Sequence, residues 1–217
     1  MVDLKGMSRK KKAEYIWDYY KIHIICIIAI IFIVGSIINS QMTKIDYVFN
    51  LTMFGSSVDE NKSTELEKQL TKLVVKDGEE RKEATVANIP IDGSSSDNAS
   101  ISSQYMQKFV AQVSVGDIDL LVLDKVMFES LVKKDIFLKL NNISQLDLDS
   151  IKNEKIEASG SDSNSNSNKA VYAINVQDNK MFKDMGYDTQ SKVIGIVSTS
   201  KQKDRAILVV KWLLNVK

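Results

Sequence analysis

One apolar run near the N-terminus constrains this chain more than any other feature. It reads IHIICIIAIIFIVGSII, from Ile22 to Ile38, and lies between Lys21 and Asn39. At about 1.5 Å per residue, an α-helix over this run covers most of the roughly 30 Å hydrocarbon core of a bilayer. The sequence therefore predicts a transmembrane helix over residues 22–39.

The residues that flank this run predict its orientation. Trp17, Tyr19 and Tyr20 precede it, as aromatic residues do at a membrane interface. Basic residues gather on the same side, at positions 9–12 and 21, whereas the far side begins NSQMTKID. By the positive-inside rule, residues 1–21 form a basic cytoplasmic tail with an interfacial segment. The part of the chain after the span then lies outside the cell.

Three other interpretations of the run compete with a retained signal anchor. A cleaved signal peptide has a shorter apolar region and a small-x-small site, but Ile38-Asn39-Ser40 begins with isoleucine. A lipoprotein signal needs its cysteine after the run, and Cys26 lies near its start. A buried core helix does not explain the basic and aromatic flanks. The retained anchor fits best, while cleavage stays an open alternative.

Charge and cysteine content narrow the class of protein. The chain has 29 Lys and Arg against 28 Asp and Glu, a net charge of +1, which gives no basis for bulk nucleic-acid binding. Cys26 is the single cysteine, so residues 45–217 contain no disulfide. A cysteine-free outer domain fits a Gram-positive or otherwise disulfide-poor bacterial surface. That segment is long enough to fold around an ordinary hydrophobic core.

The hydrophobic patterns after the span alternate between strand and helix. The polar segment GSDSNSNSN at 160–168 predicts a mobile loop. The order β-α-β-α-β-α, a loop region, then β-β-α predicts a three-layer α/β domain with a mostly parallel sheet. The strands are expected at 44–55, 83–91, 118–123, 169–176 and 192–200, and the helices at 58–75, 101–115, around 127–132 and from 204 onward.

Two stretches of this sequence carry a family likeness. The run VGDIDLLVLDKVMFESLVKKDIFLKLNN resembles the first-lobe signature of bacterial extracytoplasmic solute-binding proteins of the periplasmic-binding-protein type II class. The tail IGIVSTSKQKDRAILVVKWLLN is similar to the closing strand and helix of that lobe. The segment RKKKAEYIWDYYKIHI resembles the start of membrane-anchored versions found in Firmicutes. The resemblance implies a binding lobe, a transporter or other membrane protein as partner, and a small-molecule ligand.

The sequence departs from that class in one respect. In proteins of that class, a second lobe is inserted before the closing strand. Here only the short segment from Gln177 to Ser191 occupies that position. We therefore expect a single lobe, so that closure of two lobes over a ligand cannot occur within this chain.

Three polar segments mark the expected ligand site. In an open parallel sheet, ligands bind beyond the carboxyl ends of the strands. Two of the segments precede helices, whose first backbone amides can hold a carboxylate or phosphate. The alternative is that these residues cap helices and fill turns. The candidate ligand-binding residues are Gly55, Ser56, Ser57, Asp92, Gly93, Ser94 and Asp124.

No catalytic or metal-binding pattern stands out. His23 is the single histidine and lies in the predicted span, so a histidine base or zinc site outside it is excluded. Asp117 and Asp119 are expected to be solvated or to cap a turn. No cofactor motif occurs. The sequence predicts a non-enzymatic, membrane-anchored binding or accessory domain linked to a transporter or surface complex. The alternative is an envelope-associated hydrolase that uses strand-end Asp and Ser residues.

Overall fold

The computed structural model describes residues 8–55, 57–79, 81–90, 98–160 and 169–216. The chain divides into two compact units, residues 1–45 and residues 46–217. Each unit is described by itself. The expected mobile loop at 160–168 lies, apart from Gly160, outside the described residues.

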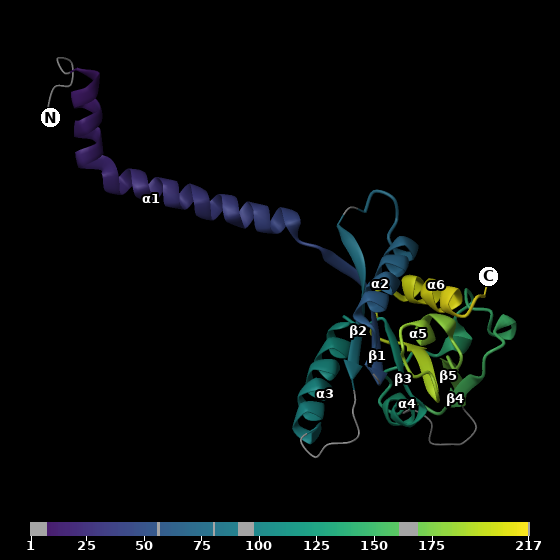
Figure 1. Cartoon of the computed structure of the whole chain (residues 1–217). Helices are drawn as coiled ribbons and strands as arrows, with labels where there is room; N and C mark the ends of the chain where they lie inside the picture. Colours follow the sequence, from purple (N-terminus) through teal and green to yellow (C-terminus); the bar gives the residue numbers. More distant parts are fainter. Residues whose placement is uncertain (1–7, 56, 80, 91–97, 161–168, 217) are drawn as a thin grey trace. The chain divides into compact units, whose positions relative to one another are not determined.

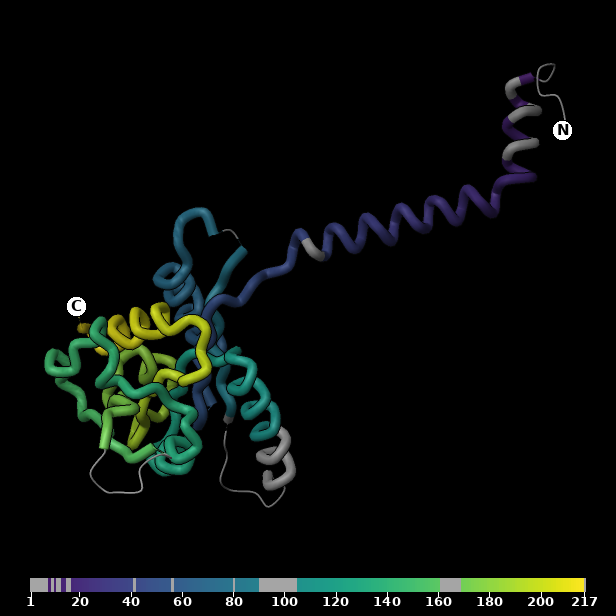
Figure 2. The backbone as a smooth tube through the Cα atoms, turned by 180° about the vertical axis from the view of Figure 1, so that it is seen from behind, coloured from purple at the N-terminus to yellow at the C-terminus, as the bar shows by residue number. Residues whose placement is uncertain are grey.

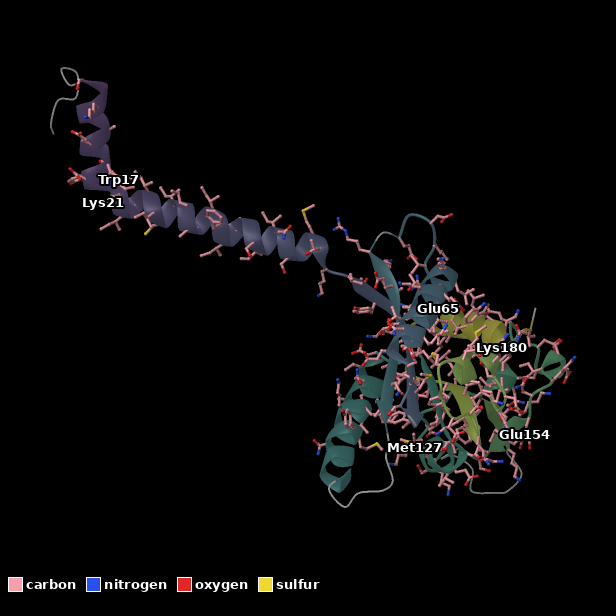
Figure 3. The ribbon with its side chains drawn as sticks, viewed as in Figure 1. Trp17, Lys21, Glu65, Met127, Glu154 and Lys180 are labelled. Atoms are coloured by element: carbon pink, nitrogen blue, oxygen red, sulfur yellow. The ribbon has the colours of Figure 1, made fainter. Side chains whose placement is uncertain are left out.

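The first unit is one long helix, α1, from Arg9 to Thr43. Within it, Trp17–Ser40 is long and apolar enough to cross a membrane, and none of it is buried. It is the one such helix among the described residues. The predicted span at 22–39 lies inside it. Figure 3 labels Trp17 and Lys21 at the end of this stretch nearer the N-terminus, where the ribbon changes direction.

The second unit is built on a six-stranded sheet with the order β2-β1-β3-β6-β5-β4 (Figure 1). β1 pairs in parallel with both β2 and β3, whereas β6, β5 and β4 follow as antiparallel neighbours. The strands are β1 Asp46–Gly55, β2 Lys82–Pro90, β3 Leu120–Asp124, β4 Lys155–Ala158, β5 Ala170–Asn175 and β6 Lys192–Ile196.

The mixed sheet corrects the expectation of a mostly parallel one. The helical crossovers between β1, β2 and β3 keep these three strands parallel, as the alternating pattern predicts. The alternating order of strands and helices predicts a parallel β6 as well, and every residue of β6 is buried. However, burial of both faces requires helices on both sides of the sheet and does not fix the strand's direction. β6 is antiparallel to β3.

Helices cover both faces of the sheet, as the expected three-layer arrangement requires. One hydrophobic cluster joins one face to α2, α5 and α6, and a second joins the other face to α3 and α4. Figures 1 and 2 show α3 beside β1 and β2 from opposite sides. The helices are α2 Glu60–Val74, α3 Asn98–Val115, α4 Lys125–Val132, α5 Lys180–Asp184 and α6 Lys203–Leu213, with short 3-10 turns η2 Leu140–Asn142 and η3 Leu148–Ser150.

Alternating side chains along the central strands supply both clusters. Leu51 and Met53 of β1 belong to the cluster under α2, whereas Phe54 belongs to the cluster under α3. Phe54 meets Phe109 of α3 edge to face, with ring centroids 5.1 Å apart. None of the described side chains of α1 belongs to either cluster, and all the residues of both clusters come from residues 46–217.

Candidate functional site

The parallel strands β1 and β3 are neighbours, and their last residues are the predicted site residues Gly55 and Asp124. Lys192 stands directly opposite Asp124 in the antiparallel pair of β3 and β6. The Lys192 Nζ lies 2.9 Å from Oδ2 of Asp124. A Cβ added to Gly55 would lie 2.6 Å from the same nitrogen. Gly55 and Asp124 therefore meet in one cluster around the Lys192 ammonium group.

Lys192 is only 4% exposed, which is rare for a lysine unless its charge is paired. Besides contacting Asp124, its Nζ donates a hydrogen bond of 3.2 Å to the carbonyl oxygen of Phe54. It also lies 5.5 Å from the ring centroid of Tyr187, within the range of a cation–π contact. The Asp124 side chain is 49% exposed, so water reaches its carboxylate. The buried cation is thus satisfied by groups of the protein itself.

Tyr187 completes the cluster from the segment before β6. Its hydroxyl donates a 2.6 Å hydrogen bond to the Phe54 carbonyl, the same acceptor that Lys192 uses. Burial raises the pKa of the Tyr187 hydroxyl, and the carboxylates of Asp124 and Asp188 raise that pKa further. Tyr187 therefore stays protonated at neutral pH and serves as a hydrogen-bond donor.

Gly55 owes its identity to this close approach. Its φ of +148° lies in a region that side chains disfavour, and an added Cβ would also come within 3.3 Å of the Tyr187 hydroxyl. The glycine thus lets the end of β1 lie against two buried polar groups. The space beside Gly55 is occupied by Lys192 in this structure.

Ser57 lines a different space, a cavity of about 520 Å³ bounded by α2 and β2. At the start of α2, the Asp59 carboxylate accepts the backbone N–H of Lys62 at 3.1 Å and so caps the helix. Glu60 follows in the first turn. An anion bound here would therefore meet two carboxylates, and the ligand-binding role of Ser57 stays a prediction. The predicted residues Ser56, Asp92, Gly93 and Ser94 lie outside the described residues.

The sequence predicts that Asp119 is solvated or caps the turn before β3, and the structure corrects this prediction. Asp119 is 3% exposed. Its Oδ2 accepts the backbone N–H of Asn50 at 2.8 Å, and its Oδ1 accepts the hydroxyl of Ser200 at 2.5 Å. Burial raises the pKa of the Asp119 carboxyl, while the hydrogen bonds from Ser200 and Asn50 lower it. The carboxylate joins β1 to the segment that follows β6.

Gly116 shapes the same turn. Its φ is +73°, and an added Cβ would lie 2.5 Å from the carbonyl oxygen of Thr199. Asp117 is exposed, as the sequence predicts, and Asp119 lies two residues further along the chain. Next to this turn is a cavity of about 340 Å³. It lies at the amino ends of the parallel strands, opposite the edge where the sequence places a ligand.

A further charge cluster holds α6 against the connection between α2 and β2. Glu79 accepts the Lys76 backbone N–H at 2.9 Å, the Lys82 Nζ at 2.8 Å and the Arg205 guanidinium at 3.0 Å. The hydrogen bonds from Lys76 and Lys82, together with the nearby positive charges, lower the pKa of the Glu79 carboxyl to about 2. Arg205 also donates to the Val74 carbonyl at 3.1 Å. The cluster therefore stabilises the packing of α6 on α2.

Sequence reasoning missed Lys192, Tyr187 and the burial of Asp119. Lys192 opens the apolar strand KVIGI, where a lysine is usually a solvated flank. Its acceptor Phe54 is 138 positions away in the sequence, so no local pattern connects the two. The close approach of Gly55 to the buried Lys192 ammonium group could not be predicted from the sequence either. The strand-end rule identified Gly55 itself.

Among the described residues, no group of three or more His, Cys, Asp or Glu side chains could hold a metal ion. Comparison of the chain with protein-family models, with curated proteins and with solved structures gives no match. The resemblance to solute-binding proteins therefore stays a prediction from the sequence.

Proposed function

We propose that the chain is a membrane-anchored extracytoplasmic binding or accessory domain, associated with a transporter or a surface protein complex. The observation that carries the proposal is that one chain combines an apolar helix with a separately packed domain. Trp17–Ser40 exposes an apolar surface along a whole membrane-spanning length, and residues 46–217 enclose their own hydrophobic clusters. An anchor joined to a separately packed domain suits a protein that presents a surface at the membrane.

The basic residues at positions 9–12 and 21 support an outward-facing domain. They precede the apolar stretch, whereas the first residues after Ser40 carry only Lys44. The positive-inside rule then places the tail in the cytoplasm and residues 46–217 outside. The single-lobe relationship to type II binding proteins is part of the same proposal, supported by the parallel β2-β1-β3 unit with its helical crossovers.

The alternative of an envelope hydrolase draws little support from the strand-end cluster. Asp124, the described acid that such an enzyme would use, is held 2.9 Å from the Lys192 ammonium group. A general base needs its carboxylate within hydrogen-bond reach of a proton on the substrate. Replacing Asp124 by alanine would test the point. Turnover of an envelope polymer that is abolished by Asp124→Ala would replace the binding proposal.

The binding proposal is tested with the full chain in its membrane. A thermal-shift screen of amino acids, sugars and peptides on the chain in nanodiscs would run beside cross-linking in intact cells. The matched control is a fusion in which α1 carries an unrelated soluble domain. The proposal expects a stabilising ligand, or a membrane protein that cross-links to residues 46–217 and not to the control. If both experiments give nothing, the proposal loses its support.

A further inference from the structure

A polar cavity lies at the amino ends of the parallel strands, and the packing of the fold does not account for it. Its volume is about 340 Å³, and the start of β1, the end of α3, the turn before β3 and the segment before α6 all contribute to its lining. A water molecule occupies about 30 Å³ of liquid, and pockets for small organic ligands begin at roughly 300 Å³. The cavity therefore fits a small organic molecule better than a bare ion.

A buried acid that forms no ion pair with a described residue lines this cavity. Asp119 is 3% exposed and receives hydrogen bonds only from neutral groups, the Asn50 amide and the Ser200 hydroxyl. Among the described residues it forms no ion pair. A buried charge is costly unless a counter-charge lies close to it. The positive charge of Arg205 stabilises this carboxylate without a hydrogen bond to it. The cavity is the space in which a positively charged group of a ligand could approach the carboxylate directly.

Opposite charges at the rim extend this pattern. Asp117 and Lys201 both line the cavity and both are exposed. Neither forms an ion pair with another residue in the part of the chain that the structure describes. The amide side chains of Gln112 and Gln202 stand in the same lining. The lining thus offers one negative and one positive exposed side chain, together with neutral hydrogen-bonding groups.

We propose that this cavity binds a small zwitterion of the amino-acid type, with its ammonium group against Asp119 and Asp117 and its carboxylate toward Lys201. The inference rests on the proposed binding function and names a ligand class for it. A metal cation fits less well, because Lys201 would repel it and no third acidic side chain completes a coordination shell. A simple anion fits less well, because the buried charge in the cavity is negative. Tyr47, 60% exposed and also in the lining, is an aromatic residue that could contact the ammonium group.

Isothermal titration calorimetry of the full chain in nanodiscs, with a panel of L-amino acids as probes, tests this assignment. We expect at least one amino acid to bind. Its methyl ester, which lacks the carboxylate, and its N-acetyl derivative, which lacks the ammonium group, should each bind at least about tenfold more weakly. Calcium chloride is titrated in parallel, and calcium binding that is lost in Asp119→Asn would make the cavity a metal site instead.

Variants place the ligand in this cavity. Asp117→Asn and Lys201→Gln change exposed side chains, so the fold should persist, and each should weaken binding at least about tenfold. Lys133→Gln, also exposed but at the end of α4, is the control and should leave the affinity unchanged. Asp119→Asn should abolish binding. If this last variant fails to fold, the two rim variants decide the question.

The negative results separate the cavity assignment from the proposed function. An amino acid that binds equally well to Asp117→Asn and Lys201→Gln lies elsewhere, which overturns the cavity assignment and leaves the proposed function intact. Binding of no amino acid also overturns the assignment. A cytoplasmic location of residues 46–217, measured separately, would overturn the proposed function whatever the titrations give.

Discussion

Replacing Gly55 by alanine should destabilise the domain severely, because the new methyl group would displace a buried charge. The Cβ would lie 2.6 Å from the Lys192 Nζ, well inside van der Waals contact. That nitrogen would have to move by several tenths of an ångström or more, away from a Phe54 carbonyl that it contacts at 3.2 Å. Loss of a hydrogen bond from a charged group costs about 1.5–3 kcal/mol. Backbone strain at this φ adds about 1–3 kcal/mol.

The expected loss for Gly55→Ala is therefore about 2.5–6 kcal/mol in the free energy of unfolding. Gly78→Ala is the matched control, because Gly78 also has a positive φ, of +87°, but an added Cβ there meets nothing within 4 Å. It should cost only the backbone strain of about 1–3 kcal/mol. Urea unfolding of the full chain in detergent, followed by the fluorescence of the partly buried Trp212, measures both values.

The Lys192→Ala background separates the contact from the backbone strain. Without the lysine side chain, Gly55→Ala should lose about 1.5–3 kcal/mol of its cost, since no ammonium group remains to be displaced. If Gly55→Ala costs the same with and without Lys192, the cluster does not determine the identity of residue 55. The reasoning about the strand-end site would then be wrong.

Two further predictions concern the charge cluster and the second hydrophobic cluster. The pKa of the Glu79 carboxyl falls from 4.5 to about 2 on folding, so its contribution to stability is complete above pH 4.5 and is lost as the pH falls toward 2. Glu79→Gln should flatten this part of the curve of unfolding free energy against pH, and an unchanged slope would contradict the assignment. Phe109→Ala should cost about 3–5 kcal/mol, because the ring is fully buried against Phe54. A loss below about 1 kcal/mol in urea unfolding would show that α3 does not depend on this contact.

Much of the secondary structure could be predicted because its signals are local. β1 is rich in aromatic and β-branched residues, α2 repeats leucines at helical spacing, and both occur where the sequence places them. β4 was missed because Lys155–Ala158 is short and half polar, and it pairs at the sheet edge with β5 alone. The direction of β6 depends on its neighbours in the sheet rather than on its own residues.

The candidate site was only partly predictable, for a related reason. The strand-end rule identifies Gly55 and Asp124, since each closes a recognisable strand. It cannot identify Lys192, which reaches them across the sheet from β6. Asp119 was misjudged because an acid between two apolar residues, Ile118 and Leu120, resembles the exposed position of an alternating strand. Its burial follows from the close packing of Ser200 and Asn50.

The topology of the chain in the membrane tests the central claim most directly. Cys26 is the single cysteine, so Cys26→Ser provides a background without thiols. Single cysteines are then introduced by Ser8→Cys, before the apolar stretch, or by Glu129→Cys, on the exposed side of α4. A membrane-impermeant maleimide is applied to intact cells. We predict that the cysteine at 129 is labelled at once and that at 8 only after permeabilisation. The reverse pattern would place residues 46–217 in the cytoplasm and contradict the account.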